Sequence, residues 1–231
     1  MVIHGLQKLT LLDFPGHTAC TVFTGGCNWR CPFCHNAGLA ADPTSQPVIP
    51  EAELFSLLTK RRGLLDGVAV TGGEPTLQKD LPDFLERIKN LGFAVKLDTN
   101  GTNPVMLRSL LERGLADYVA MDIKAGPENY PTVTGTVRCR LDAVRESAAI
   151  LMEGHTDFEF RTTVVKELHS DEDFLAIGEW LRGDSKYFLQ GFRDSGELMR
   201  GGLSACSRGE MEHFRQVVLP DLPRTELRGV D

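Results

Sequence analysis

The sequence predicts an α/β fold: a partial (β/α)6 TIM-like barrel with a parallel sheet, open on one side. Two observations predict it. Short apolar runs alternate with helical stripes along the chain, which indicates right-handed βαβ units and a parallel sheet. The chain holds about six such units, fewer than the eight that close a complete barrel.

Each element has its own local signal. Runs rich in β-branched and aromatic residues indicate strands, at 18–24, 67–71, 94–98, 118–122, 158–165 and 187–190. Apolar residues at helical spacing predict the intervening helices, with stripes at 54–58, 81–91, 107–111, 141–151 and 174–181. We expect one domain over residues 1–231, with a short lead-in at 1–17 and a loose tail at about 220–231.

Composition narrows the class of protein. The chain has 231 residues, 42% of them hydrophobic, and a formal net charge of −7. A chain this acidic is a poor partner for nucleic acid, whose phosphates would repel it. The first residues lack a secretory signal, and no run approaches the ~20 apolar residues of a membrane helix. We therefore expect a cytoplasmic protein, in a compartment where closely spaced cysteines indicate metal or redox chemistry.

The residues with chemical potential follow the ends of the predicted strands. Cys27 to Cys34 follow the first strand, and Gly72-Gly73-Glu74-Pro75 follow the second. Asp98-Thr99-Asn100-Gly101 end the third strand, and Asp122-Ile123-Lys124 end the fourth. Parallel α/β folds build their sites at this edge, so we expect these residues to share one site.

Cys27, Cys31 and Cys34 lie in one loop at positions i, i+4 and i+7. Three thiolates can hold three irons of a four-iron cluster and leave the fourth iron open for another ligand. A zinc site is the alternative, with His35 as the fourth ligand, but adjacent side chains in a loop rarely reach one ion together. The other three cysteines, Cys20, Cys139 and Cys206, are isolated and are expected to hold no metal.

The CxxxCxxC loop, with Phe33 just before its third cysteine, resembles the signature of the radical S-adenosylmethionine (SAM) superfamily. The resemblance implies one [4Fe–4S] cluster whose open iron binds the amino and carboxylate groups of SAM. It implies that one electron cleaves the sulfonium to methionine and a 5′-deoxyadenosyl radical, which then abstracts a hydrogen atom. The cofactors carry that chemistry, and the protein positions and shields them.

Further residues are assigned by the same resemblance. Gly72, Gly73 and Glu74 resemble the motif that binds the amino group of SAM, although a plain glycine turn is the alternative. Arg161 resembles an arginine that contacts the cofactor, or it forms a surface ion pair. Three residues are expected to line the cofactor pocket, with Gln190 placed near the adenine: Phe33, His35 and Gln190. Trp29 either shields the cluster or packs in the core.

Two acidic strand ends suggest a cation site. Asp98 and Asp122 would repel one another at one edge unless a positive charge joined them, and Lys124 could supply one. The pair also resembles elements of activating enzymes that bind a monovalent cation. By that resemblance the Na⁺ or K⁺ ligands are Asp98, Thr99, Asp122 and the Ile123 carbonyl, all hard oxygen donors. Helix caps or ordinary ion pairs are the alternative.

Over nearly its whole length the sequence resembles the glycyl-radical-enzyme activases, in particular the single-cluster activating proteins of anaerobic ribonucleoside-triphosphate reductase. The lead-in Asp13-Phe14-Pro15-Gly16 and the run from Gly25 to Asn36 carry this likeness. Pyruvate formate-lyase activases are close cousins. The resemblance implies hydrogen abstraction from a backbone glycine of a large glycyl radical enzyme, with flavodoxin or ferredoxin as electron donor.

Two alternatives from other classes stay open at this point. One is a small-molecule radical enzyme, such as one similar to 7-carboxy-7-deazaguanine synthase. The other is an electron-transfer module that holds a cluster but cleaves no SAM. The methionine-binding motif argues against the module, because electron transfer needs no such pocket.

Overall fold

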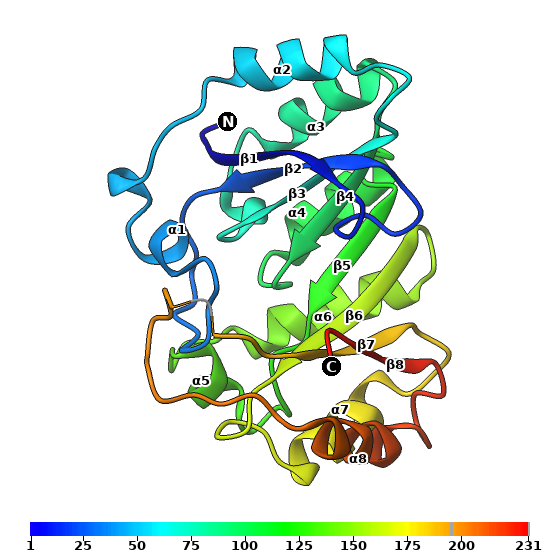
Figure 1. Cartoon of the computed structure of the whole chain (residues 1–231). Helices are drawn as coiled ribbons and strands as arrows, with labels where there is room; N and C mark the ends of the chain where they lie inside the picture. The colour runs from blue at the N-terminus through cyan, green and yellow to red at the C-terminus, as the bar shows by residue number, and fades with distance from the viewer. Residues whose placement is uncertain (195, 231) are drawn as a thin grey trace.

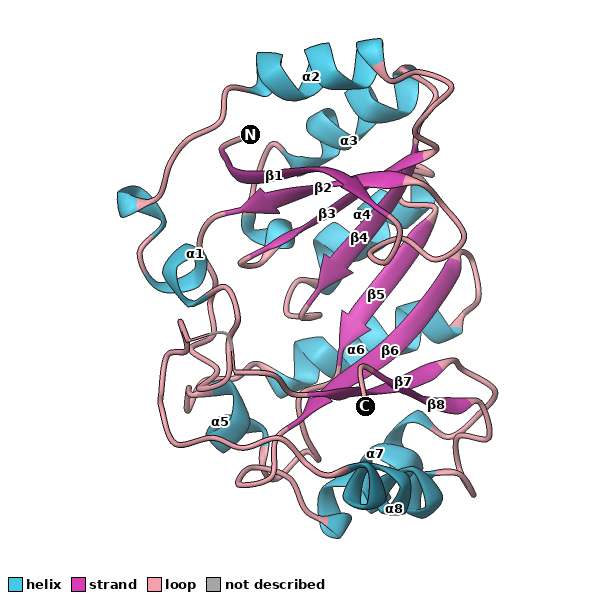
Figure 2. Ribbon diagram, viewed as in Figure 1, coloured by secondary structure: helices cyan, strands magenta, loops and turns pink. Residues whose placement is uncertain are grey.

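The computed structural model describes residues 1–194 and 196–230. It contains one eight-stranded sheet whose strands lie side by side in chain order, from β1 to β8. Only β1 and β2 pair antiparallel; every later pair is parallel. The sheet curves, and its main helices lie along the outer side (Figures 1 and 2). Because β1 and β8 stay unpaired with one another, the barrel is open, as predicted.

The strands are β1 (Ile3–Thr10), β2 (Ala19–Thr24), β3 (Gly67–Gly72), β4 (Ala94–Thr99), β5 (Tyr118–Asp122), β6 (Asp157–Val164), β7 (Tyr187–Gly191) and β8 (Thr225–Arg228). The α-helices are α1 (Ala37–Ala41), α2 (Glu51–Lys60), α3 (Leu81–Asn90), α4 (Pro104–Glu112), α5 (Tyr130–Thr134), α6 (Leu141–Met152), α7 (Asp171–Leu181) and α8 (Arg208–Val218). Two short 3₁₀ turns are η1 (Pro43–Ser45) and η2 (Pro75–Leu77). The six predicted strands are β2 to β7, and the five predicted helices are α2, α3, α4, α6 and α7.

The expected loose tail is wrong for residues 220–230. Leu222 is fully buried and Thr225 is 1% exposed. The strand β8 pairs with β7 in parallel, from Tyr187↔Thr225 to Gln190↔Arg228. The segment Thr225–Arg228 is short and polar, so its pattern alone does not mark a strand; the edge of β7 supplies the hydrogen bonds that order it. Asp231 lies outside the described residues.

The lead-in also contains a strand that the sequence did not predict. β1 is an edge strand paired to β2, with a register shift on each side of Gly5–Gln7. After it, Phe14 turns back under the sheet and is 1% exposed. Its ring packs with Ala19 and Tyr118, and a Cβ on Gly67 would come within 2.7 Å of it. The lead-in therefore closes the amino-terminal end of the barrel and leaves the carboxyl-terminal end open.

The two faces of the sheet differ in chemistry. Side chains alternate along a strand: Val68 and Val70 of β3 are fully buried in the main hydrophobic core. On β6 the side chains of Glu159 and Arg161 point to the other face of the sheet, which is the concave one. Among the described residues, no helix is long and apolar enough to cross a membrane.

An ion pair between a half-exposed arginine and a buried glutamate anchors β8. Arg228 donates two hydrogen bonds to Glu159 on β6, at 2.9 and 3.1 Å, and its guanidinium lies 3.7 Å from the centre of the Phe188 ring. Glu159 is 1% exposed and also accepts a bond from Tyr118. Its pKa is lowered because Arg228 and Tyr118 outweigh the cost of burial.

We expect Arg228→Ala to lower the free energy of unfolding by about 1–3 kcal/mol, because Glu159 would stay buried without its cation. Arg224→Ala is the matched control. Arg224 lies in the same tail, but its ion pair with Asp184 is exposed at 3.6 Å, and its loss should cost no more than about 1 kcal/mol. Urea unfolding of both variants measures the difference; equal small effects would mean that the tail does not stabilise the fold.

Candidate active site

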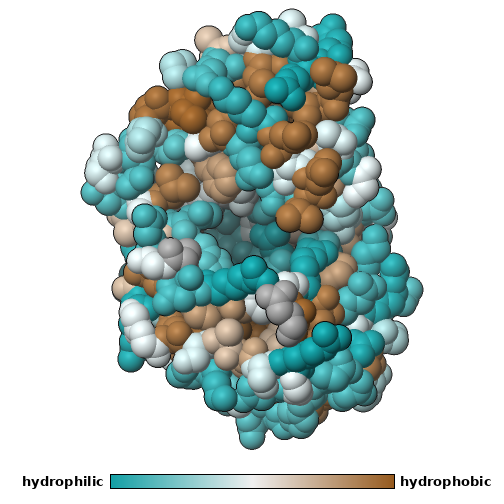
Figure 3. Space-filling view, viewed as in Figure 1, coloured by the Kyte–Doolittle hydropathy of each residue, from teal (hydrophilic) through white to brown (hydrophobic). Residues whose placement is uncertain are grey.

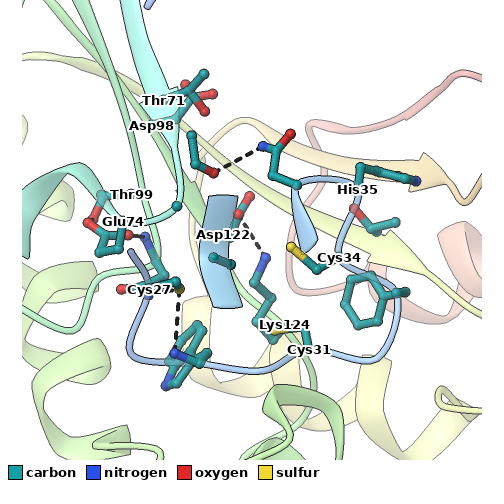
Figure 4. Close-up of a pocket in the computed structure, with 18 of the residues that line it drawn as sticks. Cys27, Cys31, Cys34, His35, Thr71, Glu74, Asp98, Thr99, Asp122 and Lys124 are labelled. Carbon is teal, nitrogen blue, oxygen red and sulfur yellow. Dashed lines mark hydrogen bonds and ion pairs between the residues drawn. The ribbon is translucent and has the colours of Figure 1, made fainter. Parts of the chain in front are cut away.

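A cavity opens at the carboxyl ends of strands β2 to β7, and its volume is about 270 Å³. This is close to the lower end of the range for ligand pockets, roughly 300–1,000 Å³. Figure 3 shows it as a hydrophilic hollow, and Figure 4 shows its side chains. Its walls include nearly every residue that the sequence singled out: Cys27, Cys31, Phe33, Cys34, His35, Gly72, Gly73, Glu74, Asp98, Thr99, Asp122, Lys124, Arg161 and Gln190. Ile123 is fully buried and does not line it.

The cysteine loop leaves β2 and is held in a tight turn. The Cys27 sulfur accepts a hydrogen bond from the Trp29 amide at 3.4 Å, and the Cys34 amide donates to the Cys31 carbonyl at 3.1 Å. Outside the turn, the Arg30 guanidinium donates to the Cys27 and Trp29 carbonyls at 2.6 and 2.8 Å. These contacts turn all three thiols toward the same cavity (Figure 4).

The three thiols suit a multi-iron cluster better than a single ion, because no group of three or more His, Cys, Asp or Glu side chains among the described residues could hold one metal ion. Burial raises the pKa of Cys27 and Cys34 and that of Cys31 to about 12, although the nearby Lys124 cation opposes the shift. The chain without metal therefore holds neutral thiols, and a cluster would take them as thiolates. Three sulfur donors around one cavity fit an iron–sulfur cluster.

His35 does not complete a four-ligand zinc site with these cysteines. Its Nε2 atom lies 2.6 Å from the Arg193 carbonyl oxygen, and its ring stacks on Phe192 with 5.8 Å between centroids. The imidazole thus extends the pocket wall toward β7, and Figure 4 shows it directed away from Cys34.

The two glycines after β3 are required by the chain's own backbone. A Cβ on Gly73 would lie 2.0 Å from the Gly26 carbonyl oxygen. Gly72 has a φ of +120°, and a Cβ there would meet the Thr24 backbone at 2.3 Å. The Glu74 amide then donates to the Gly26 carbonyl at 2.8 Å. The glycine pair therefore lets the end of β3 pack directly against the start of the cysteine loop.

Glu74 joins two strand ends. It is 1% exposed, and burial raises its pKa. One carboxylate oxygen accepts from the Thr76 amide at 3.0 Å and the Thr99 hydroxyl at 2.8 Å. The other accepts from the Asn100 amide at 2.7 Å. The carboxylate thus fastens β3 to β4, and that second oxygen remains available for an amino group.

Charged side chains form a continuous chain across the cavity floor. Lys96 pairs with Asp98, and Asp98 lies 3.1 Å from Arg161. Arg161 also pairs with Asp122, which lies 2.8 Å from Lys124. Burial alone would raise the pKa of both carboxyls, but Arg161 and the two lysines hold them below the usual range. Asp122 and Cys31 raise the pKa of Lys124 despite its burial.

The four oxygens expected to bind a monovalent cation are all engaged. Asp98 and Asp122 pair with side-chain cations, as described. The Thr99 hydroxyl donates to Glu74, and the Ile123 carbonyl accepts from the Thr162 hydroxyl at 2.6 Å.

Sequence reasoning missed several residues of the pocket wall. In sequence Asn100 stands out only as part of a motif, yet its side-chain amide donates to Asn28 at 2.9 Å and accepts from the Thr102 hydroxyl at 2.7 Å. Asn36 donates to the Gly72 carbonyl at 3.0 Å. Thr163 also lines the cavity; since it lies two residues after Arg161, the period of a strand could have identified it.

Comparison with known proteins identifies the family. A family model described as the radical SAM superfamily matches residues 21–181. A Methanocaldococcus jannaschii protein, named as a candidate glycyl-radical enzyme activating enzyme, is 32% identical over 198 residues, which cover 83% of this chain and 80% of that protein.

Two further sequence relatives match less of the chain, and one solved structure shares its fold. The pyruvate formate-lyase-activating enzyme of Clostridium pasteurianum is 32% identical, over 58% of this chain and 57% of its own. A Thermococcus kodakarensis protein, named as a candidate GTP 3′,8-cyclase, is 30% identical over 64% of this chain and 48% of its own. Streptococcus suis SuiB, solved with bound S-adenosylmethionine, shares the fold with a TM-score of 0.69 at 14% identity, over 89% of this chain and 49% of that one.

The raised thiol pKa values predict that cluster assembly releases protons. Below a thiol pKa the folded chain carries the proton, so at pH 7.5 all three thiols are neutral and about three protons should leave them as the cluster forms, in addition to those that the added hydrosulfide loses. Loading should therefore weaken as the pH falls. A pH indicator in weakly buffered anaerobic solution, with iron and sulfide added to the metal-free chain, measures the release. A blank without protein corrects for the reagents, and release of fewer than one proton would contradict the prediction.

Proposed function

The chain belongs to the radical SAM superfamily, and we propose that it is an activating enzyme that places a radical on a backbone glycine of a large partner enzyme. One observation carries the proposal: three thiols, one buried and two half-buried, and the charged ends of β4 and β5 face one open cavity. The similarity to the M. jannaschii protein, which covers 80% of that protein, supports it.

Each wall of the cavity has a role in this proposal. Cys27, Cys31 and Cys34 would hold a [4Fe–4S] cluster. When bound, the cluster and SAM supply the one-electron cleavage that produces a hydrogen-abstracting radical. The cationic groups of Lys124 and Arg161 would receive the carboxylate of SAM, and Glu74 its amino group, by charge-assisted hydrogen bonds.

The remaining pocket residues would orient the nucleoside end of SAM. Gln190 lies on β7 beside Thr163 of β6, in register, and its amide can bond the edge of a base. Phe33 and His35 offer ring surfaces to the same space. Phe33 is 4% exposed and keeps water away from the thiols.

We propose anaerobic ribonucleoside-triphosphate reductase as the partner, on the sequence likeness of the lead-in and cysteine loop. A pyruvate formate-lyase-type activase is the nearest variant of this proposal, supported by the C. pasteurianum relative. In either case the open side of the barrel would admit a glycine-bearing loop. Flavodoxin or ferredoxin would supply the electron, in an anaerobic cytoplasm.

A small-molecule radical enzyme is the second candidate function. The similarity to the T. kodakarensis protein, over 64% of this chain, favours it. That reading predicts turnover of a small substrate without any protein partner, whereas an activase forms a lasting product only on its partner.

Binding of a monovalent cation is a further proposal, and side-chain cations compete for the same carboxylates. Na⁺ or K⁺ at Asp98, Thr99, Asp122 and the Ile123 carbonyl would have to displace Lys124 or Arg161 from the carboxylates. If the cation binds, SAM should bind several-fold more tightly in sodium or potassium buffer than in choline buffer of equal ionic strength. Isothermal titration of the cluster-loaded chain measures this; an unchanged affinity would show that the side-chain cations supply the whole positive charge.

The decisive experiment mixes the cluster-loaded chain anaerobically with SAM, a reductant and the anaerobic reductase. We expect the EPR doublet of a glycyl radical on the reductase. Cys31→Ala should abolish both the doublet and the release of 5′-deoxyadenosine, because two thiolates cannot hold the cluster. Cys206→Ala, a substitution outside the cavity, is the matched control and should retain both signals. Full activity in Cys31→Ala would overturn the assignment. 5′-deoxyadenosine without a doublet would point to another partner or to a small substrate.

A further inference from the structure

The outer face of the cysteine loop is basic, although the whole chain carries a net charge of −7. Two segments form this face, residues 27–41 and 129–141; neither contains an Asp or Glu, and the exposed acids Asp42, Glu128 and Asp142 border them. They contain three exposed arginines, Arg30, Arg138 and Arg140. Val137 lies among them and is 91% exposed. We call these four residues the arginine patch.

Backbone contacts hold the two segments together. The Arg30 amide donates to the Thr134 carbonyl at 2.9 Å. Gly135, with a φ of +65°, lies so close that a Cβ there would come within 2.2 Å of the Arg30 carbonyl oxygen. Arg30 therefore lies next to the turn that leads into Val137 and Arg138, and the patch is a consequence of the fold.

The charge of the patch is not neutralised within the part of the chain that the structure describes. No ion pair with a carboxylate is found for Arg30, Arg138 or Arg140 there; Arg30 donates only to backbone carbonyls. By contrast, the arginine inside the cavity, Arg161, is paired with two carboxylates. An exposed apolar side chain near arginines that have no carboxylate partner is typical of a transient protein interface.

The patch is connected to the wall of the thiol cavity through Trp29. Trp29 is 2% exposed and lines the cavity together with Cys27 and Cys31. Its indole nitrogen donates to the Cys139 carbonyl at 3.2 Å, and Cys139 is flanked in sequence by Arg138 and Arg140. One side chain, that of Trp29, therefore spans from the patch to the cavity wall that holds the cysteines.

We propose that the arginine patch is the docking surface for a small acidic protein that delivers one electron to the metal site. This rests on the proposed function, which requires an electron for each cleavage. In the step, the carrier is oxidised by one electron and the cluster is reduced by one electron, and no atom is transferred. The negative charge over the rest of the chain repels an acidic carrier, so the field steers it to this face and raises the association rate.

The test compares two drivers of 5′-deoxyadenosine formation by the cluster-loaded chain: reduced flavodoxin and dithionite. In Arg138→Glu/Arg140→Glu we expect kcat/KM for flavodoxin to fall by about tenfold or more at low salt, while the dithionite-driven rate stays within about twofold. The matched control is Lys60→Glu/Arg62→Glu, which changes the net charge equally at two exposed positions of another surface. It should retain the flavodoxin-driven rate.

A binding measurement makes the result independent of catalysis. Surface plasmon resonance with immobilised flavodoxin should show binding of the unmodified chain that weakens with salt, and loss of binding in the patch variant alone. Equal losses of binding in both double variants would show that only the net charge matters and would overturn the proposal. Absence of binding by the unmodified chain would overturn it as well. A patch variant that keeps flavodoxin-driven cleavage but forms no glycyl radical would assign the surface to the partner enzyme. Failure with dithionite in the unmodified chain would contradict the proposed function instead.

Discussion

The arrangement of two half-buried carboxylates around Arg161 is the constraint on which the site depends. Asp98 and Asp122 end adjacent parallel strands, so the sheet brings two negative charges together in a poorly hydrated cavity. Removing one partner from such a group is costly, because the remaining charge stays buried without compensation. Arg161, one strand further on, bridges both carboxylates, and Lys96 and Lys124 complete the chain of alternating charges. The floor of the cavity is thereby held rigid and close to neutral.

The opposite wall is positioned by backbone rather than by charge. The cysteine loop starts at Gly26, which packs against Gly73 with no room for a side chain. Glu74 then connects that glycine pair to β4 through the Thr99 hydroxyl and the Asn100 amide. The thiols and the charged strand ends belong to different elements, yet these few short contacts fix their relative positions. A site that must hold a cluster and a charged cofactor together benefits from this preorganisation.

Much of the fold was predictable, because β2 to β7 are rich in β-branched, aromatic and other apolar residues and alternate with amphipathic helices. The edges were not. β1 and β8 each pair with one other strand of the sheet. The short Thr225–Arg228 strand is ordered by β7 and by the Arg228–Glu159 ion pair, which joins residues 69 positions apart. The helix α8 did carry a local signal, the Ser207–Glu210 capping box, that could have been used.

The sequence by itself determined which residues share the site. Motifs at the ends of successive parallel strands must meet at one edge, and the spacing of three cysteines selects soft-metal chemistry. Only the tertiary structure decided how those residues are engaged: that Glu74 links two strands, that side-chain cations already occupy Asp98 and Asp122, that His35 bonds the Arg193 carbonyl, and that Asn100 belongs to the wall. The physical reason is distance along the chain. Spacing in sequence reports which element a residue belongs to, whereas its partners come from other strands and loops, and a linear pattern does not record those contacts.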